Sequence, residues 1–397
     1  MTNIIIKNKQ INELGSCDLE SLLSLYSNRF QNLSQNLKLD STEKIFNLSE
    51  LEDNFTKKIS IIIRINNIVQ QLESYSINCE DFSKAKTLIF FKEKVSKGTL
   101  AKLKILIEGI VVKFIIENGI LLDIIFPGDK SLLLKLDSTH LKTKSKVAIM
   151  SDIHIGSTLF REENFLDAIN FIINDADIKY LILAGDVCDG VGIYPGHENN
   201  LLITDIEKQY VKAAEILNII PKEKTVFFVP GNHDASPLFE PQKKLTERYS
   251  KYFNKNIIFT TNPTNIFLEN RDFLVYHGAS LDGIISSSEE FSYDDAGKVM
   301  EYLLRIKHLA PKLGRSAISS WYNIDHLIIK NMPWAFITGH IHTFTNYELS
   351  NGTKLFNAGT WQDLSDFQRR LGHKPIFCKL LICSLGDGFT EVKDFYA

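Results

Sequence analysis

The spacing of apolar and polar positions changes along the chain and predicts a different kind of structure in each part. Near the N-terminus, apolar residues recur at helical spacing over 19–33, and Asp18 is a suitable N-cap for a helix there. We therefore expect residues 1–55 to form a short helical N-terminal region. No motif in this region points to chemistry.

Residues 56–135 carry short runs of β-forming residues instead. The runs are 59–69, 87–91, 103–107, 110–116 and 120–126, and Asn118 and Gly119 form a hairpin signal between the last two. Roughly five short strands without a long helix predict a small β-barrel, for which an OB-type barrel is one candidate. An unspecialised β-sandwich and an edge extension of the next domain are the alternatives.

Residues 136–146 are polar and basic and are expected to form a linker. From 147 to 397, buried apolar runs alternate with helical patterns over 163–173, 206–217 and 294–309. Alternating strands and helices predict an α/β layered domain around a largely buried sheet. The expected fold class is thus α/β in this domain, and α+β overall.

The composition narrows the class of protein. Apolar residues make up 44% of the 397 residues, which argues against extended disorder, and a formal net charge of −3 gives no global positive field for nucleic acid. The five cysteines form no C-x-x-C pair and are typical of reduced thiols. A signal peptide and a membrane span are both missing from the sequence pattern. A cytoplasmic protein without membrane contact is expected.

Potential metal ligands follow five of the apolar runs in the C-terminal domain. Because ligands gather at the carboxyl ends of strands in an open α/β sheet, these side chains should meet at one rim. One such segment alone is weak evidence for a metal site, since an Asp-x-His pair can occur by chance and Gly-Asn-His-Asp can be an ordinary turn. Five segments in this order are highly specific. The segments contain Asp152 and His154; Asp186 and Asp189; Asn232, His233 and Asp234; His277; and His340 and His342.

This order of motifs resembles the calcineurin-like metallophosphoesterase superfamily from about residue 146 onward. The resemblance implies a layered β-sandwich flanked by helices, with two metal sites that share Asp186 as a bridging ligand. It also implies that His233 faces the substrate as a catalytic residue and that Asp234 orients its ring. The implied ligands of the first site are Asp152, His154, Asp186 and His342, and those of the second are Asp186, Asn232, His277 and His340.

The chemistry of this ligand set favours hydrolysis. Imidazole, carboxylate and amide ligands without a thiolate suit Mn²⁺, Fe or Zn²⁺ better than Mg²⁺, and we expect two divalent ions with Mn²⁺ as the activating metal. Such a pair clamps phosphate oxygens and lowers the pKa of a bridging water, while protonated His233 assists the leaving group. No G-x-S-x-G motif, P-loop or dinucleotide-binding motif offers a competing chemistry.

Further segments resemble the small, exonuclease subunits of archaeal family D DNA polymerases. The segments are 189–198, 205–210, 357–362, 367–368 and 374–375. That resemblance implies an OB-type barrel before the phosphoesterase domain and a 3′→5′ proofreading exonuclease acting on DNA. It also implies a large catalytic polymerase subunit as partner, primer–template and single-stranded DNA as substrates, contact with a sliding clamp, and a place at the nucleoid.

The substrate contacts are the least specific part of the sequence prediction. Asp189 and Tyr194 are candidates for lining the entry of single-stranded DNA, with Tyr194 stacking on a base, although 190–196 also fits a plain Gly/Pro-rich loop. Trp361 and Gln362 are either rim residues or packing residues. Five lysines of the barrel either contact phosphates or form a solvated surface, and the barrel itself binds either DNA or the partner subunit. These lysines are Lys92, Lys94, Lys97, Lys102 and Lys104.

Three other functions fit parts of the pattern. A stand-alone metallophosphoesterase acting on small phosphodiesters would share the metal ligands but would not need the barrel. A non-catalytic polymerase scaffold would be expected to lack some of the ligands, and all of them are present. A double-strand-break nuclease would be expected to begin close to its Asp-x-His motif, whereas about 150 residues precede it here.

Overall fold

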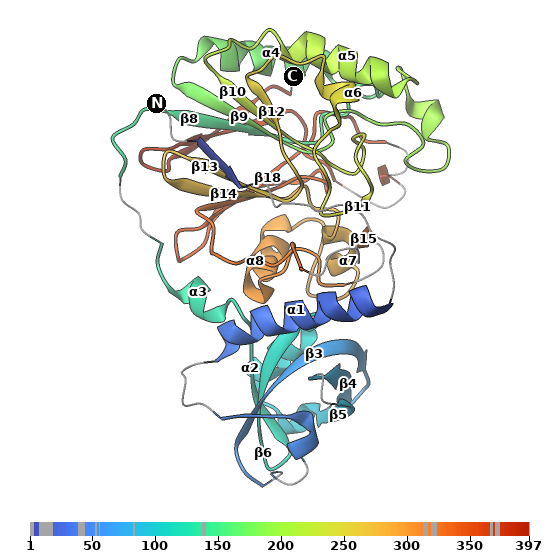
Figure 1. The fold of residues 1–397 in the computed structure, drawn as a ribbon, viewed down its shortest axis with the longest axis vertical. Coiled ribbons are helices and arrows are strands. Elements are labelled where there is room, and N and C mark those ends of the chain that lie inside the picture. The colour runs from blue at the N-terminus through green and yellow to red at the C-terminus, as the bar shows by residue number, and fades with distance from the viewer. Residues whose placement is uncertain are drawn as a thin grey trace.

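The computed structural model describes most of the chain, and Figure 1 shows it as a tall stack of layers. A sheet sandwich with helices on both sides forms the upper part, helix α1 (Leu19–Leu37) crosses below it, and a smaller β-sheet unit lies at the bottom. The described residues are 4–7, 19–38, 44–51, 54, 56–81, 84–136, 140–312, 317–318, 324–365, 368–369 and 374–396.

Two six-stranded sheets form the sandwich. The first has the order β12-β10-β9-β8-β19-β20, in which β8, β9, β10 and β12 run parallel and β19 and β20 pair antiparallel. Its strands are β8 (Lys146–Met150), β9 (Ile178–Ala184), β10 (Thr225–Val229), β12 (Ile257–Phe259), β19 (Lys379–Ser384) and β20 (Thr390–Asp394).

The second sheet has the order β1-β13-β14-β16-β18-β17, with β14, β16 and β18 parallel. Its strands are β1 (Ile4–Lys7), β13 (Thr264–Leu268), β14 (Arg271–Val275), β16 (Ala335–Thr338), β17 (Phe344–Glu348) and β18 (Lys354–Ala358).

The central strands of both sheets are buried on both faces, which explains their continuous apolar runs. An apolar core that includes Ile149, Phe227 and Phe356 fills the space between the sheets. Helices α4 (Glu162–Asn174) and α5 (Ile206–Leu217) cover the outer face of the first sheet. Helices α7 (Leu281–Ile285) and α8 (Ala296–Ile306) cover that of the second. The predicted mixed α/β architecture is therefore confirmed, and the helices expected at 163–173, 206–217 and 294–309 are α4, α5 and α8.

The second sheet is not built from the C-terminal part alone. Strand β1 pairs antiparallel with β13, so that Ile4 lies opposite Leu268. The prediction of a short helical region over 1–55 accounts for α1 but not for the strand Ile4–Lys7. The predicted N-cap Asp18 lies outside the described residues.

The lower unit is a five-stranded antiparallel sheet of order β5-β4-β3-β6-β7, and β2 (Ile45–Phe46) pairs with β3 at one side. The strands are β3 (Ile59–Gln70), β4 (Ser74–Glu80), β5 (Ala85–Phe91), β6 (Val111–Glu117) and β7 (Ile120–Ile125). Helix α2 (Lys97–Lys104) lies between β5 and β6, and its N-cap Ser96 accepts a hydrogen bond from the Thr99 backbone N–H. One continuous apolar core extends from this sheet to α7 and α8.

Two predictions for this unit are corrected. The strand expected at 103–107 is wrong, because Leu103 and Lys104 end α2 and Leu106 and Ile107 are buried in the loop that follows. Strand β4 was not predicted, although its buried Tyr75, Ile77 and Cys79 alternate with polar neighbours. The short polar side chains of Ser74, Ser76 and Asn78 give this run the composition of a loop.

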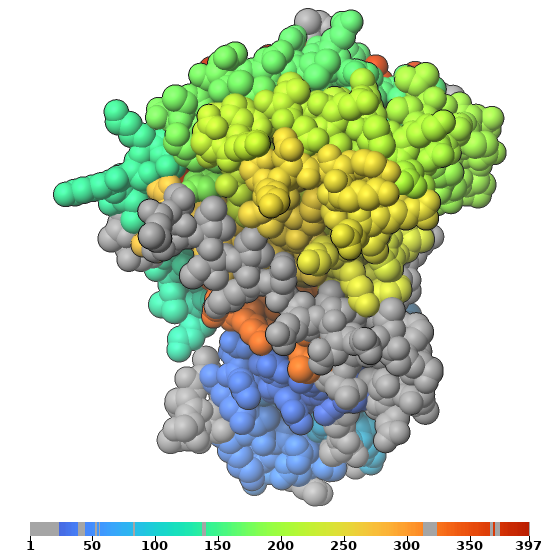
Figure 2. Space-filling model, turned by 45° about the horizontal axis from the view of Figure 1, so that its top comes forward, coloured from blue at the N-terminus to red at the C-terminus, as the bar shows by residue number. Residues whose placement is uncertain are grey.

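Helix α1 joins the upper and lower parts through one buried arginine. The Arg29 Nε atom donates to Asp325 at 2.7 Å, and Nη1 donates to the carbonyl oxygens of Pro311 at 2.7 Å and Gly109 at 3.3 Å. Gly109 precedes β6, whereas Pro311 and Asp325 follow α8. A single guanidinium thus connects three separate segments. In Figure 2 the blue surface of the N-terminal helical region lies directly against the orange surface of the later segment.

The remaining elements are short. They are β11 (Phe239–Glu240), which pairs with β15 (Ala317–Ile318), α3 (Asp129–Leu133), α6 (Glu247–Ser250), and the 3₁₀ turns η1 (Leu48–Glu50), η2 (Lys92–Lys94) and η3 (His197–Asn200). Among the described residues, no helix combines the length and the apolar character that a membrane span requires. The four described cysteines, Cys79, Cys188, Cys378 and Cys383, are free and buried.

Candidate metal centre

The predicted ligands lie directly after five strands, three from the first sheet and two from the second. Asp152, Asp186 and Asn232 follow β8, β9 and β10, and His277 and His340 follow β14 and β16. The parallel strands of each sheet direct their carboxyl ends to one edge, and the sandwich brings the two edges together. The rim that the sequence predicts is therefore shared by both sheets.

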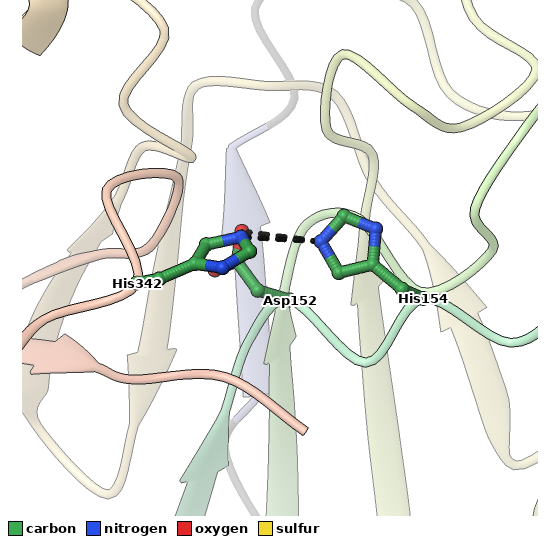
Figure 3. A group of neighbouring side chains, drawn as sticks. All are labelled: Asp152, His154 and His342. Atoms are coloured by element: carbon green, nitrogen blue, oxygen red, sulfur yellow. Dashed lines mark hydrogen bonds and ion pairs between the residues drawn. The ribbon is translucent and has the colours of Figure 1, made fainter. Parts of the chain in front are cut away.

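One cluster is built from Asp152, His154 and His342 (Figure 3). The two imidazoles come from different loops and both lie close to the Asp152 carboxylate. The Asp152 Oδ1 atom is 3.3 Å from His342 Nε2 and 3.9 Å from His154 Nε2, and the two Nε2 atoms are 3.2 Å apart. All three residues are buried.

A second cluster is built from Asp186, His277 and His340. His277 Nε2 lies 3.1 Å from Asp186 Oδ2 and 3.1 Å from Asn232 Oδ1. The other ring nitrogen, His277 Nδ1, is 2.9 Å from the Ala184 carbonyl oxygen, which fixes the orientation of the ring. Each cluster contains three of the four ligands predicted for one metal site, and Asn232 lies beside the second cluster.

The backbone at this rim is strained. Asp152, His154, Asp186, His340 and His342 all have positive φ angles, between 52° and 68°. A non-glycine residue in the left-handed region costs of order 1–3 kcal/mol where it is held away from its preferred conformation, and such residues cluster at functional sites. Five of the seven predicted ligands share this strain, which marks the rim as a functional site independently of the motifs.

Asp189, and not Asp234, holds the ring of His233. The His233 Nδ1 atom is 2.7 Å from the Asp189 carbonyl oxygen and 3.6 Å from its carboxylate. The Asp234 carboxylate instead accepts hydrogen bonds from backbone N–H groups and from the Tyr210 hydroxyl. Its backbone donors are Gly231, Val187 and Cys188. The predicted role of Asp234 is therefore wrong, because it stabilises the turns that carry the ligands.

Asp189 is also not a substrate contact. Its side chain is buried, and its Oδ1 atom lies 2.9 Å from His154 Nδ1 while Oδ2 lies 3.2 Å from His197 Nε2. This carboxylate thus connects the predicted ligand His154 with the catalytic candidate His233. The contact with His154 Nδ1 leaves Nε2 as the nitrogen that faces the first cluster.

The other three predicted substrate contacts are either buried packing residues or accessible residues at the rim of the site. Trp361 is fully buried against Phe165, with ring centroids 5.4 Å apart, so it is a packing residue. Gln362 is buried too and donates to Ser157 Oγ at 2.8 Å. Tyr194 is half-buried, and its ring centroid lies 4.4 Å from that of His197 and 6.5 Å from that of His233. Of these three, only Tyr194 is both accessible and close to His233.

Two residues of the 357–362 segment hold the ligand turns. The Asn357 side chain donates to the Gly339 carbonyl oxygen at 2.9 Å, directly before His340. The Thr360 hydroxyl donates to the Asp152 carbonyl oxygen at 2.9 Å. This segment therefore stabilises the strained backbone of two ligand turns.

The charges of the site are strongly coupled. Burial raises the pKa of the Asp186 carboxyl, but the charges of His277 and His233 outweigh this effect and hold the pKa far below its usual range. Burial lowers the pKa of His277 and of His233. For His277 the charge and hydrogen bond of Asp186, with the charge of Asp152, together outweigh burial and raise the pKa to about 10. For His233 the charge of Asp186 and the charge and hydrogen bonds of Asp189 together raise the pKa to about 9. Burial and the nearby Asp186 together raise the pKa of Asp234 to about 6. Buried carboxylates surrounded by imidazoles are the arrangement that divalent cations require.

The donor set fits two divalent ions. Each cluster offers one buried carboxylate and two imidazoles, and Asn232 adds an amide oxygen to the second. Since two imidazole nitrogens 3.2 Å apart both face the Asp152 carboxylate, a cation would satisfy all three groups at once. The absence of a thiolate among these residues favours Mn²⁺, Fe or Zn²⁺.

Gly231 is required for the position of Asp186. A Cβ atom on Gly231 would lie 2.1 Å from Asp186 Oδ1 and 2.5 Å from its backbone nitrogen. We expect Gly231→Ala to displace the carboxylate and to weaken Mn²⁺ binding by about 10- to 100-fold, measured by equilibrium dialysis. Gly98→Ala in α2 is the matched control, because its Cβ would meet no atom closer than 3.8 Å. Equal affinity in the two variants would contradict the role of Asp186.

Sequence reasoning did not connect His197, Gln368 and Asp282 with the predicted site residues that their side chains contact. His197 contacts Asp189, the Gln368 side-chain nitrogen lies 2.8 Å from His342 Nδ1, and Asp282 Oδ2 lies 3.0 Å from His340 Nε2. Gln368 belongs to a segment that carried the family resemblance. The only local signal for Asp282 is its position five residues after His277.

Comparison with known proteins identifies the family. Residues 147–346 match the DNA polymerase alpha/epsilon B-subunit family, and the chain belongs to this family. Curated relatives that the chain matches include DNA polymerase II small subunits of archaea. That of Thermoplasma acidophilum is 40% identical over 255 residues, which cover 63% of this chain and 52% of the relative. That of Methanocaldococcus jannaschii is 30% identical over 375 residues, which cover 90% of this chain and 62% of the relative.

The chain spans only about half the length of the first relatives it matches. Among solved structures, Vps29 from Entamoeba histolytica, complexed with Zn²⁺, aligns with 63% of this chain and 99% of its own length at 15% identity and a TM-score of 0.30. A likeness this weak carries no argument about the fold or the site.

Proposed function

We propose that this chain is the small subunit of an archaeal DNA polymerase II and a metal-dependent 3′→5′ exonuclease that removes mismatched nucleotides from a primer end. The observation that carries the proposal is the convergence of all seven predicted ligands beside His233, in a chain of a polymerase subunit family. The large catalytic subunit is the proposed partner, primer–template and single-stranded DNA are the proposed substrates, and a sliding clamp is a further partner. Such a complex would act at the nucleoid.

The proposed chemistry assigns a role to each group of the site. Asp152, His154, Asp186 and His342 would hold one divalent ion, and Asp186, Asn232, His277 and His340 the other. When bound, the two ions would neutralise the phosphate oxygens and lower the pKa of the attacking water. His233 donates a proton to the leaving oxygen, because Asp189 holds its Nδ1 side and leaves Nε2 available. Asp189 positions both His233 and His154.

The lower unit is proposed to be an OB-type barrel over residues 56–135, linked by 136–146 to the phosphoesterase domain. Its strand order and the position of α2 between β5 and β6 support this topology. Among the described strands, β5 and β7 are the two ends of the sheet, so closure of the barrel is part of the proposal. We propose that this unit docks the large subunit and does not bind DNA, since two of its five lysines already pair with carboxylates, one in this unit and one before α8. Lys102 pairs with Asp123, and Lys104 with Glu290.

The test uses the purified chain with Mn²⁺ and a 5′-labelled primer–template that carries a 3′ mismatch. We expect stepwise shortening from the 3′ end that stops in EDTA and in an Asp186→Asn variant. Asp294→Asn, which changes an exposed carboxylate paired with Lys374, is the matched control and should cleave like the unmodified chain.

Other outcomes distinguish the alternatives. Hydrolysis of bis-p-nitrophenyl phosphate without any shortening of DNA would contradict the exonuclease and support a stand-alone phosphodiesterase. Inactivity on both substrates, even after addition of the large subunit, would support a non-catalytic scaffold.

Tyr194 is proposed to stack on the base of the terminal nucleotide. Its ring is accessible and close to His233, and its hydroxyl accepts a hydrogen bond from Asn200 at 3.1 Å. Stacking of one base contributes about 1–3 kcal/mol, so Tyr194→Ala should raise KM for DNA by about 5- to 150-fold. Tyr194→Phe keeps the ring and should keep a KM close to the original. A KM unchanged in Tyr194→Ala would refute the stacking contact.

A further inference from the structure

A carboxylate outside the predicted motifs lies against one of the predicted metal ligands. Asp282 Oδ2 is 3.0 Å from His340 Nε2, and the two side chains are 40% and 16% exposed. His340 belongs to the second cluster together with Asp186 and His277. The contact therefore lies at the outer side of the second proposed metal site.

The chain reaches this position through a tight turn after His277. Gly278 has φ of 118°, and a Cβ atom there would lie 3.0 Å from Leu281 Cδ1 and 3.4 Å from His340 Cβ. The missing side chain lets the backbone pass close to His340 before it enters α7. Asp282 is the second residue of that helix. One short segment thus supplies both a ligand of the cluster and the carboxylate behind another ligand.

Asp282 is held firmly in this position. Its neighbours Leu281 and Ile284 are buried in the apolar core next to α8. Its second carboxylate oxygen, Oδ1, accepts a hydrogen bond from the Tyr293 hydroxyl at 2.9 Å. The carboxylate therefore cannot turn away from His340 without losing a second contact.

The contact determines which nitrogen of His340 is free. A neutral imidazole has one N–H donor and one lone pair, and a carboxylate accepts a hydrogen bond. With Nε2–H donating to Asp282, the lone pair is on Nδ1. Histidines that bind metals commonly donate their other N–H to a carboxylate, which fixes the tautomer and the ring orientation and makes the ligand more basic.

We propose that Asp282 is a positioning residue that holds His340 through Nε2–H and presents Nδ1 to a divalent ion in the second site. This inference rests on the metal centre of the proposed function and extends it to a residue outside the motifs. Asp282 acts through His340 and contributes no bond to the ion.

The test measures Mn²⁺ binding to the full-length, metal-stripped chain by equilibrium dialysis, without DNA. Asp282→Ala should weaken one of two sites by about 10- to 100-fold, because the ring of His340 loses its anchor. Asp282→Asn should restore most of this affinity, because the amide oxygen still accepts the Nε2–H bond. An unchanged isotherm in Asp282→Ala would overturn the proposal. Equal losses in both variants would also overturn it, since they would make the carboxylate a direct ligand.

A double variant separates positioning from damage to the fold. If Asp282 acts through His340, adding Asp282→Ala to His340→Ala should cause no further loss of Mn²⁺ affinity. Additive losses would show instead that the substitution disturbs α7. Asp294→Ala, at an exposed carboxylate paired with Lys374, is the matched control and should bind Mn²⁺ like the unmodified chain.

The same data distinguish this inference from the proposed function. The chain could bind two Mn²⁺ ions, one of them dependent on Asp282, and yet not cut DNA. This result would support the inference about Asp282 and contradict the exonuclease activity. If the chain binds no Mn²⁺, both the proposed metal centre and the inference about Asp282 are contradicted.

Discussion

Replacing His233 by alanine is expected to lower kcat for phosphodiester hydrolysis by about 10²- to 10⁴-fold, the usual contribution of a general acid. Mn²⁺ binding should remain, because His233 is not among the proposed ligands and its ring is held by Asp189 instead. The two quantities are measured on the same preparation, by cleavage of a 5′-labelled mismatched primer and by equilibrium dialysis. His233→Gln keeps a polar side chain that cannot supply the proton and should be as inactive as His233→Ala.

Asp189→Ala is the informative comparison for this prediction. The Asp189 carboxylate lies 2.9 Å from His154 Nδ1 and 3.6 Å from His233 Nδ1, so its loss should reduce Mn²⁺ affinity and kcat together, although alanine keeps the backbone carbonyl oxygen that accepts from His233. A His233→Ala variant that also loses Mn²⁺ would contradict the assignment. It would favour a different arrangement, in which His154, Asp189 and His233 form a metal site of their own.

Arg29→Met is expected to lower the free energy of unfolding by about 3–5 kcal/mol, the cost of removing one partner from a buried ion pair. Arg29 and Asp325 are both buried, and the substitution also leaves the carbonyl oxygens of Gly109 and Pro311 without this donor. Urea denaturation of the variant and the unmodified chain measures the difference. Arg248→Met removes an exposed ion pair with Glu207, which water and salt screen, and should leave stability almost unchanged.

The Arg29 effect should depend on pH. Burial raises the pKa of Asp325, but His308 and Arg29 outweigh it and hold the pKa well below its usual range. A carboxyl whose pKa is depressed in the folded state stabilises the fold fully above its unfolded pKa, near 4, and loses this contribution as the pH falls below that value. The difference between Arg29→Met and the unmodified chain should therefore be largest near neutral pH and shrink below about pH 4. A difference that grows in acid would exclude the ion pair as its origin.

The fold was predictable where the chain carries a strong local pattern. Buried apolar runs of five to seven residues gave β8, β9 and β10, and apolar residues at helical spacing gave α4 and α5. The same approach failed at β4 and at 103–107. The alternation in β4 is weak because its outward residues are small and polar, and a short apolar run such as 103–107 has no periodicity that separates a strand from the end of a helix.

The sequence by itself showed which potential metal ligands follow the strand ends and so meet at one edge of a sheet, and its resemblance to a known superfamily assigned them to two metal sites. Only the tertiary structure decided which side chains support them. Asp189 rather than Asp234 holds His233, Asp282 lies against His340, and Arg29 meets Asp325 across 296 residues. The physical reason is that a strand end positions its own ligand locally, whereas the partner of a side chain depends on how loops and layers from distant parts of the chain pack together.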